Sequence, residues 1–187
     1  PLASVSDPSR IDAIGDGLAA GGLPVVEVAL RGEHGLDALR RLSSRGDLLV
    51  GAGTVLDRHQ ARAAIDAGAQ FLVTPGLDAD VVAHARSAGL PIVPGVITPT
   101  EIQAARALGI TRVKLFHAAR FGGLKLVDAY ADVYRDIRFM PSGGVDAVTA
   151  LEYLSHRSVF AVSGSWLLEG DTAAEIAAAV SPSSSQL

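Results

Sequence analysis

Eight short apolar runs recur along the 187-residue chain at intervals of about 20–26 residues. Each interval has room for one strand, one helix and two loops. The runs are Leu2–Val5, Val25–Leu30, Leu48–Val50, Phe71–Val73, Ile92–Val93, Val113–Phe116, Phe139–Met140 and Val159–Val162. The alanine-rich segments between them have helical spacing of apolar residues. This alternation predicts an α/β fold built from parallel strands.

Glycines mark the expected ends of three of the helices. These predicted helices and the glycines that follow them are 57–67 with Gly68, 78–88 with Gly89, and 100–108 with Gly109. Glycine is common directly after a helix because it adopts the left-handed backbone conformation that terminates the hydrogen-bond ladder. The three glycines therefore indicate that the helical segments are separate elements rather than parts of longer helices.

Two architectures accommodate eight strands that alternate with eight helices: a closed (β/α)8 TIM barrel and an open doubly wound sheet. Even spacing and strands that are apolar on both faces favour the barrel. An open sheet would normally have a glycine-rich phosphate motif after its first strand, where this chain has only Ser6-Asp7-Pro8-Ser9. We expect one barrel domain over residues 1–180 and a frayed, Ser/Pro-rich tail at 181–187.

The composition excludes several classes of function. The chain has no cysteine, so it has neither a disulfide framework nor a thiolate metal site, and this fits a reducing cytoplasm. Its formal net charge is −4 and it lacks a basic run, which argues against nucleic-acid and membrane partners. The five histidines are scattered without metal-ligand spacing, so we expect no metal site.

Lys114 stands inside an apolar strand, Val113–Phe116, and is one of only two lysines in the chain. A central parallel strand is covered on both faces, and lysine is rarely buried without a partner or a function. Desolvation favours the uncharged amine, which is a nucleophile toward carbonyl groups. The residue type and its position predict a catalytic lysine, with a purely structural ion pair as the alternative.

Glu27 interrupts the second apolar run, Val25–Leu30, and the period of a strand places it on the same face as Arg31. A buried glutamate needs a partner or a function. It can form a structural ion pair with Lys114, and the same pair can act as a nucleophile and a proton shuttle, because the two roles are not exclusive. Arg31, at the end of the strand, can bind a carboxylate or a phosphate, or it is a plain surface residue.

Catalytic groups of (β/α)8 barrels lie at the carboxyl ends of the strands. Thr54 offers a hydroxyl at such an end, after Gly51-Ala52-Gly53. Ser142-Gly143-Gly144 follows the seventh run and Ser163-Gly164-Ser165 the eighth. Loops at these two strands often bind phosphate through backbone N–H groups and hydroxyls. Each stretch alone would be an ordinary turn, but together they favour a phosphate site.

Six motifs now resemble, in order and approximate spacing, those of the 2-keto-3-deoxy-6-phosphogluconate (KDPG) aldolases, also called 4-hydroxy-2-oxoglutarate (KHG) aldolases. The resemblance covers nearly the whole chain, and the ordered set is specific although no single motif is. The motifs are Val26–Arg31, Gly51–Leu56, Thr74–Leu77, Val113–Phe116, Pro141–Val145 and Ser163–Trp166.

The resemblance implies a homotrimeric, cytoplasmic class I lyase of carbohydrate metabolism, in the Entner–Doudoroff pathway, that uses neither metal nor cofactor. The small-molecule substrate would be a phosphorylated keto acid, KDPG, cleaved to pyruvate and glyceraldehyde 3-phosphate. Lys114 would form the Schiff base and Glu27 would be the acid/base. The residues implied to contact substrate are Arg31, Thr54, Pro75, Ser142, Gly143, Gly144, Gly164 and Ser165.

The chain departs from the family pattern at one site segment. His117-Ala118-Ala119 stands where the family commonly has Pro-Ala-Glu after Phe116. The family's N-terminal capping helix is also expected to be absent from this chain. Members of the resembled family that act on 2-keto-3-deoxy-6-phosphogalactonate tend to have Asn at the position of Arg31 and Val at that of Ser142, so the resemblance favours the gluconate-derived substrate. The alternatives are that galactonate epimer, unphosphorylated KHG, a non-covalent phosphosugar isomerase or epimerase on the same barrel, and a non-catalytic phosphometabolite-binding protein.

Overall fold

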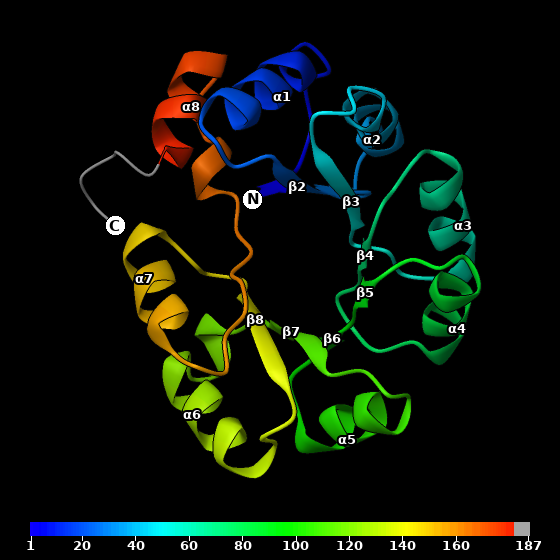
Figure 1. Cartoon of the computed structure of the whole chain (residues 1–187), viewed down its shortest axis with the longest axis vertical. Coiled ribbons are helices and arrows are strands. Elements are labelled where there is room, and N and C mark those ends of the chain that lie inside the picture. Colours follow the sequence, from blue (N-terminus) through cyan, green and yellow to red (C-terminus); the bar gives the residue numbers. More distant parts are fainter. Residues whose placement is uncertain (182–187) are drawn as a thin grey trace.

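The computed structural model describes residues 1–181, in which eight α-helices surround a ring of parallel strands (Figure 1). Five strands form one parallel sheet in chain order and three form another. The strands are β1 (Leu2–Ala3), β2 (Val25–Ala29), β3 (Leu49–Gly53), β4 (Leu72–Val73), β5 (Ile92–Val93), β6 (Gly95–Val96), β7 (Arg112–Phe116) and β8 (Arg138–Ser142). The predicted α/β fold of parallel strands is confirmed. All but one residue of the predicted frayed tail lies outside the described residues.

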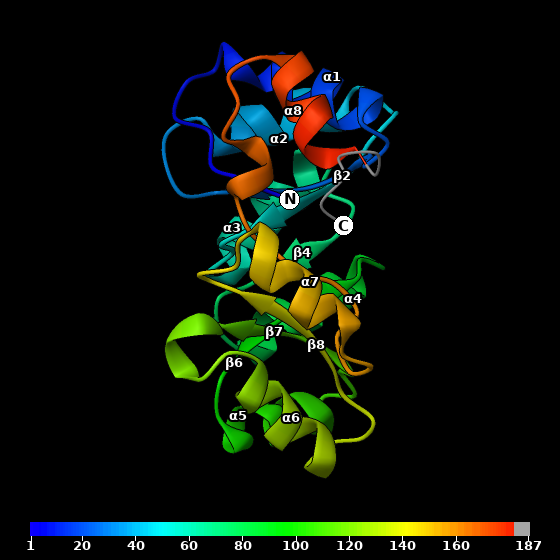
Figure 2. The same ribbon diagram turned by 90° about the vertical axis from the view of Figure 1, so that its left-hand side faces the viewer.

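The helices form the outer layer of the molecule, with α7 and α8 on the side that faces the viewer in Figure 2. None of the helices in residues 1–181 is long and apolar enough to cross a membrane. The α-helices are α1 (Arg10–Ala20), α2 (Gly35–Ser43), α3 (Arg58–Asp66), α4 (Ala79–Ser87), α5 (Pro99–Ala107), α6 (Leu124–Val133), α7 (Ala147–Ser155) and α8 (Ala173–Val180), with short 3-10 helices η1 (Ala119–Phe121) and η2 (Trp166–Leu168).

The three glycine stops are confirmed. Gly68, Gly89 and Gly109 have φ values of +96°, +72° and +70°, and each follows the single residue that caps the C-terminus of α3, α4 or α5. The residue after each glycine donates its N–H back into the last turn; the N–H of Ala69, for example, bonds to the carbonyl of Ala64 at 3.0 Å. This pattern satisfies carbonyls that the helix end would otherwise leave unpaired.

The fifth predicted strand is longer than its apolar run. β5 pairs with β4 and β6 pairs with β7, and only Pro94 separates β5 from β6. Proline lacks the N–H that a continuous ladder requires. Its carbonyl still accepts a hydrogen bond from the N–H of Lys114 at 2.8 Å. One stretch of chain, residues 92–96, therefore connects the two sheets.

The eighth run, Val159–Val162, does not form a regular strand as predicted. Two isolated bridges connect this part of the chain to β8: Val159 with Phe139, and Ser163, the residue after the run, with Ser142. The bridged residues are three positions apart in β8 and four positions apart in the facing segment. One extra residue in one partner defines a β-bulge, which reverses the side-chain alternation beyond it.

Proline again accounts for the break in the ladder. Phe139 uses both its N–H and its carbonyl to bond to the facing segment, so Pro141, two positions later, faces the same way without an N–H to donate. The carbonyl of Pro141 accepts from the N–H of Ser163 at 3.0 Å. The N–H of Leu2 donates to the carbonyl of Gly164 at 2.8 Å, which links this segment to β1. Backbone hydrogen bonds thereby join β8 to β1, as a barrel requires.

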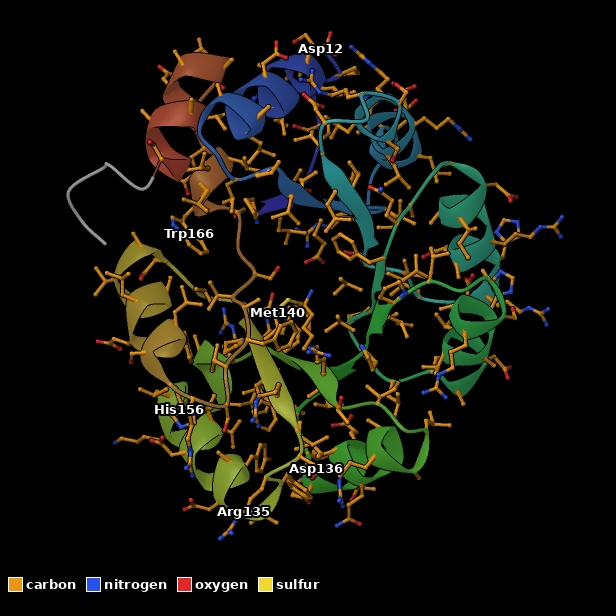
Figure 3. The ribbon with its side chains drawn as sticks, in the orientation of Figure 1. Asp12, Arg135, Asp136, Met140, His156 and Trp166 are labelled. Atoms are coloured by element: carbon orange, nitrogen blue, oxygen red, sulfur yellow. The ribbon has the colours of Figure 1, made fainter. Side chains whose placement is uncertain are left out.

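The hydrophobic core lies mainly between strands and helices. Ile11 and Leu39 of α1 and α2 and Phe139 of β8 are fully buried there. Met140 instead points toward the centre of the ring, whereas His156 lies at the periphery (Figure 3). Since successive residues of a strand point to opposite faces, the inner wall is formed by every second strand residue.

Candidate active site

Lys114 and Glu27 meet inside the ring of strands. Lys114 lies in the middle of β7 and is in register with Met140 of β8, so both side chains share the inner face. Glu27 extends from β2, and its Oε1 is 3.3 Å from the Nζ of Lys114. The two residues are 4% and 5% exposed. The structure thus brings together the two residues that the sequence singled out as an acid/base and a nucleophile.

A glycine makes room for the Glu27 carboxylate. A Cβ placed on Gly53, at the end of β3, would lie 2.3 Å from the Oε1 of Glu27. The φ of Gly53 is not positive, so its backbone conformation does not require glycine. The absence of a side chain, rather than a special turn, therefore matters at this position.

We predict that Gly53→Ala lowers kcat about 10- to 100-fold, because the added methyl group displaces the Glu27 carboxylate. Steady-state kinetics would measure the loss. Gly15→Ala is a matched control, because the atoms nearest to a Cβ at Gly15, at 2.9 Å, belong to the flexible side chain of Arg45 and not to Glu27. Equal kinetics for the two variants would contradict the prediction.

Ser163 also contacts Glu27 and was missed as a site residue. Its Oγ donates to the Oε2 of Glu27 at 2.8 Å, and the residue is 4% exposed. The sequence motif contained Ser163, but only Gly164 and Ser165 were assigned to substrate contact. The two oxygens of the carboxylate thus have separate partners, an amine on β7 and a hydroxyl after the bulge.

The loop after β8, which the sequence predicts to bind phosphate through backbone N–H groups, has two glycines in the left-handed conformation. Gly143 and Gly144 have φ values of +86° and +76°, a region that disfavours other residues. The loop bonds to the segment after β7, because the N–H of Ala118 donates to the carbonyl of Ser142 at 2.8 Å. The N–H of Ala119 donates to Gly143 at 3.2 Å. The two loops are therefore positioned together.

His117, one of the departures from the family pattern, packs against this glycine loop. A Cβ on Gly143 would lie 2.6 Å from the Nδ1 of His117.

Helix α7 begins immediately after the loop, where Asp146 accepts the N–H of Thr149 at 2.8 Å. Hydrogen bonds from the backbone and hydroxyl of Thr149 hold the pKa of the Asp146 carboxyl below its ordinary value. This cap fixes the helix start beside the loop.

The second predicted phosphate segment is Gly164–Ser165. Gly164 is half-buried, and a Cβ there would lie 2.3 Å from the ring of Trp166. Ser165 is exposed and directly precedes η2. The segment follows Ser163 without interruption, so its backbone is connected to the hydroxyl that bonds Glu27.

Arg31, Thr54 and Pro75 follow β2, β3 and β4 at the carboxyl ends of those strands. Thr54 is half-buried with a φ of +58°. The carbonyl of Pro75 lies 2.2 Å from the place of a Cβ on Gly95, which is in register with Lys114. Close packing therefore places Pro75 next to the strand that neighbours β7.

Arg31 is exposed, and its Nε donates to the Oγ of Ser4 at 3.3 Å. It lines a pocket of about 410 Å³ at the ends of β1 and β2. The other lining residues are Ser4, Val5, Ser6, Gly32, Glu33 and His34.

Residues 1–181 contain no group of three or more histidine or acidic side chains that could hold a metal ion.

Comparisons with known proteins agree on one family. A family model described as "KDPG and KHG aldolase" matches residues 1–180. The 2-dehydro-3-deoxy-phosphogluconate aldolase of Pseudomonas aeruginosa is 42% identical over 169 residues, which are 90% of this chain and 77% of that protein. The members of that family are lyases, and the match to the family model covers nearly all of this chain.

Solved structures extend the comparison to the fold. The KDPG aldolase of Zymomonas mobilis superimposes with a TM-score of 0.95 at 35% identity, covering 100% of this chain and 92% of that one. The KDPG aldolase of Legionella pneumophila, solved with pyruvate captured as a covalent carbinolamine intermediate, has a TM-score of 0.91 at 29% identity, covering 96% of this chain and 90% of that one. The (β/α)8 barrel assignment follows from these likenesses and from the strand order. By sequence and by fold, the chain belongs to the KDPG and KHG aldolase family.

Proposed function

We propose that the protein is a class I aldolase that cleaves KDPG to pyruvate and glyceraldehyde 3-phosphate, with Lys114 as the Schiff-base residue and Glu27 as the acid/base. The buried Lys114–Glu27 pair, with 3.3 Å between Nζ and Oε1, is the observation that supports this most directly. A buried ion pair is seldom worth its desolvation cost as a stabilising contact alone.

The first half of the reaction forms the covalent intermediate. Lys114 passes a proton to Glu27, and the neutral amine attacks the C2 ketone to give a carbinolamine. Glu27 returns the proton to the C2 hydroxyl, which leaves as water, and an iminium ion remains. The covalent carbinolamine captured with pyruvate in the Legionella pneumophila relative supports the first of these steps, the formation of a carbinolamine.

The second half breaks the carbon–carbon bond. The iminium ion accepts the electron pair of the C3–C4 bond while Glu27 takes the proton of the C4 hydroxyl. Glyceraldehyde 3-phosphate leaves, and an enamine of pyruvate remains on Lys114. Glu27 gives the proton it took from the C4 hydroxyl to C3 of the enamine, and attack of water on the iminium carbon that results releases pyruvate and restores the amine of Lys114. The covalent electron sink replaces one high barrier with several lower ones.

The ends of the strands supply the binding groups for both ends of the substrate. The phosphate would bind backbone N–H groups and hydroxyls of Ser142–Gly144 and Gly164–Ser165, whose glycine backbone is open at Gly143 and Gly144. Arg31 and Thr54 would bind the keto-acid end, with Pro75 lining the site. A cytoplasmic homotrimer acting in the Entner–Doudoroff pathway is the setting that the family resemblance supports.

Borohydride trapping tests the proposal directly. The protein would be incubated with pyruvate, reduced with borohydride and digested, and the peptides would be analysed by mass spectrometry. We expect a reduced pyruvate adduct on Lys114 and none on Lys125, the only other lysine. An unmodified chain, or an adduct on Lys125 alone, would rule out the proposal. An unmodified chain would favour a non-covalent isomerase. It would favour a non-catalytic binding protein if titration calorimetry shows that KDPG binds without being turned over.

Unphosphorylated KHG is the second substrate candidate, because the matching family model includes both activities. The two substrates share the keto-acid end, and only KDPG brings a phosphate to the two glycine loops. The ratio of kcat/KM for KDPG and KHG would decide between them. We expect the ratio to favour KDPG, and substitutions in the loops to act mainly on KM for KDPG.

A further inference from the structure

We infer that Ser163 is a positioning residue that holds the Glu27 carboxylate in the orientation needed for proton transfer with Lys114. The inference rests on the proposed aldolase function. Ser163 Oγ donates to Glu27 Oε2 at 2.8 Å, whereas Lys114 Nζ lies 3.3 Å from Oε1. The serine bond is the shorter of the two, and it leaves Oε1 directed toward the amine.

The Glu27 side chain is otherwise free to rotate about its terminal torsion, which is broad for a carboxylate. Gly53 lies beside Oε1 without a side chain that could fix the orientation of the carboxylate. Ser163 supplies a second point of attachment. Two partners on opposite oxygens fix the plane of the carboxylate, whereas one partner would fix only a distance.

The bulge in the eighth barrel position makes this contact possible. Val159 bridges Phe139, a fully buried residue of the outer core, so Val159 also points outward. In a regular strand, Ser163 would share that outward face, four positions later. The extra residue reverses the alternation, and Ser163 instead bridges Ser142 and reaches Glu27. The irregular backbone therefore directs a hydroxyl into the site.

The same position connects Glu27 to the proposed phosphate segment. Ser163 immediately precedes Gly164–Ser165, and its N–H is bonded to the carbonyl of Pro141 in β8. The hydroxyl is thus held by backbone bonds to the ring rather than by the mobile end of a long side chain. Such support from a rigid element is what a precisely oriented acid/base requires.

The test compares Ser163→Ala, Ser163→Thr and the control Ser158→Ala. Ser158 is equally buried, at 4% exposure, but lies at the other end of the same segment. For Ser163→Ala we expect kcat for KDPG cleavage to fall about 10- to 100-fold while KM changes less than threefold. Ser163→Thr restores the hydroxyl and is expected to recover most of the rate. Ser158→Ala is expected to keep the wild-type kcat.

Borohydride trapping with pyruvate and thermal unfolding accompany the kinetics. Ser163→Ala is expected to retain the Lys114 adduct, because the amine is intact, and to unfold cooperatively with a Tm lowered by a few degrees, because a buried carboxylate oxygen loses its hydrogen-bond donor. A Ser163→Ala enzyme with the wild-type kcat, or a Thr variant no better than Ala, would overturn the role of Ser163 and leave the aldolase proposal standing. A wild-type protein that forms no adduct would overturn both proposals.

Discussion

Replacing Lys114 with methionine is expected to lower kcat for KDPG cleavage by on the order of 10⁴-fold or more, because the nucleophile is lost while the binding residues remain. Methionine keeps the length and apolar body of the side chain inside the ring. Coupled assays of pyruvate release would measure the rate, and mass spectrometry after borohydride reduction would show that the adduct is lost.

Lys125→Met is the matched control for this experiment. Lys125 is exposed on α6, so its substitution removes the same amine from the chain without touching the inner wall. It is expected to keep the wild-type kcat and the adduct. A Lys114→Met enzyme that still cleaves KDPG within tenfold of the wild-type rate would contradict the assignment of the nucleophile.

The same variant has a second expected effect, on stability. Loss of Lys114 leaves the Glu27 carboxylate buried with the Ser163 hydroxyl but without its counter-charge. Removal of one member of a buried ion pair typically costs about 3–5 kcal/mol in the free energy of unfolding. Urea denaturation should therefore show that Lys114→Met with Glu27→Gln is more stable than Lys114→Met alone.

The positions of Lys114 and Glu27 were predictable because regular strands fix them. Each charged residue interrupts an apolar run, and a regular parallel strand fixes the face to which each of its residues points. The helix ends at Gly68, Gly89 and Gly109 were predictable for an equally local reason, the conformational freedom of glycine. Local signals of this kind depend little on how the rest of the chain packs.

The contact between Ser163 and Glu27 was not predictable, because two prolines alter the regular pattern. Pro94 divides one barrel strand into β5 and β6, and Pro141 leaves the last segment with one residue too many between its bridges. A period-2 reading assigns Ser163 to the outer face. The alternation of side chains in this segment reverses where its backbone N–H groups bond to carbonyls of β8. That point is visible only when the two segments are placed side by side.

The loops at the ends of the strands are an intermediate case. The glycines of Ser142–Gly144 indicated an open backbone, and the structure has it. That His117 packs against Gly143 depends on the hydrogen bonds that join the loops after β7 and β8, which have no signature in either loop alone. Contacts between loops follow from barrel geometry. The sequence therefore predicts which strand each loop residue follows, but not which residues of the neighbouring loop it contacts.

Replacing Glu27 with glutamine is expected to lower kcat about 10²- to 10⁴-fold, which is the range for loss of a general acid/base. The amide keeps the size of the side chain and can still accept the Ser163 hydroxyl, so the ring should retain its packing. It cannot take the proton of the C4 hydroxyl or return one to the departing C2 hydroxyl. Both the cleavage rate and the rate of adduct formation with pyruvate should fall.

Exchange of the pyruvate methyl protons with deuterated water tests a further role of Glu27, proton transfer at C3 of the enamine, separately from its role at the C4 hydroxyl. The exchange requires both the iminium ion on Lys114 and a group that moves protons at C3, and NMR follows it without any cleavage step. Lys114→Met should abolish exchange, whereas Glu27→Gln should slow it while a trapped adduct still accumulates over long incubation. If Glu27→Gln exchanged at the wild-type rate but failed to cleave KDPG, the carboxylate would serve only the C4 hydroxyl, and another group would have to protonate the enamine.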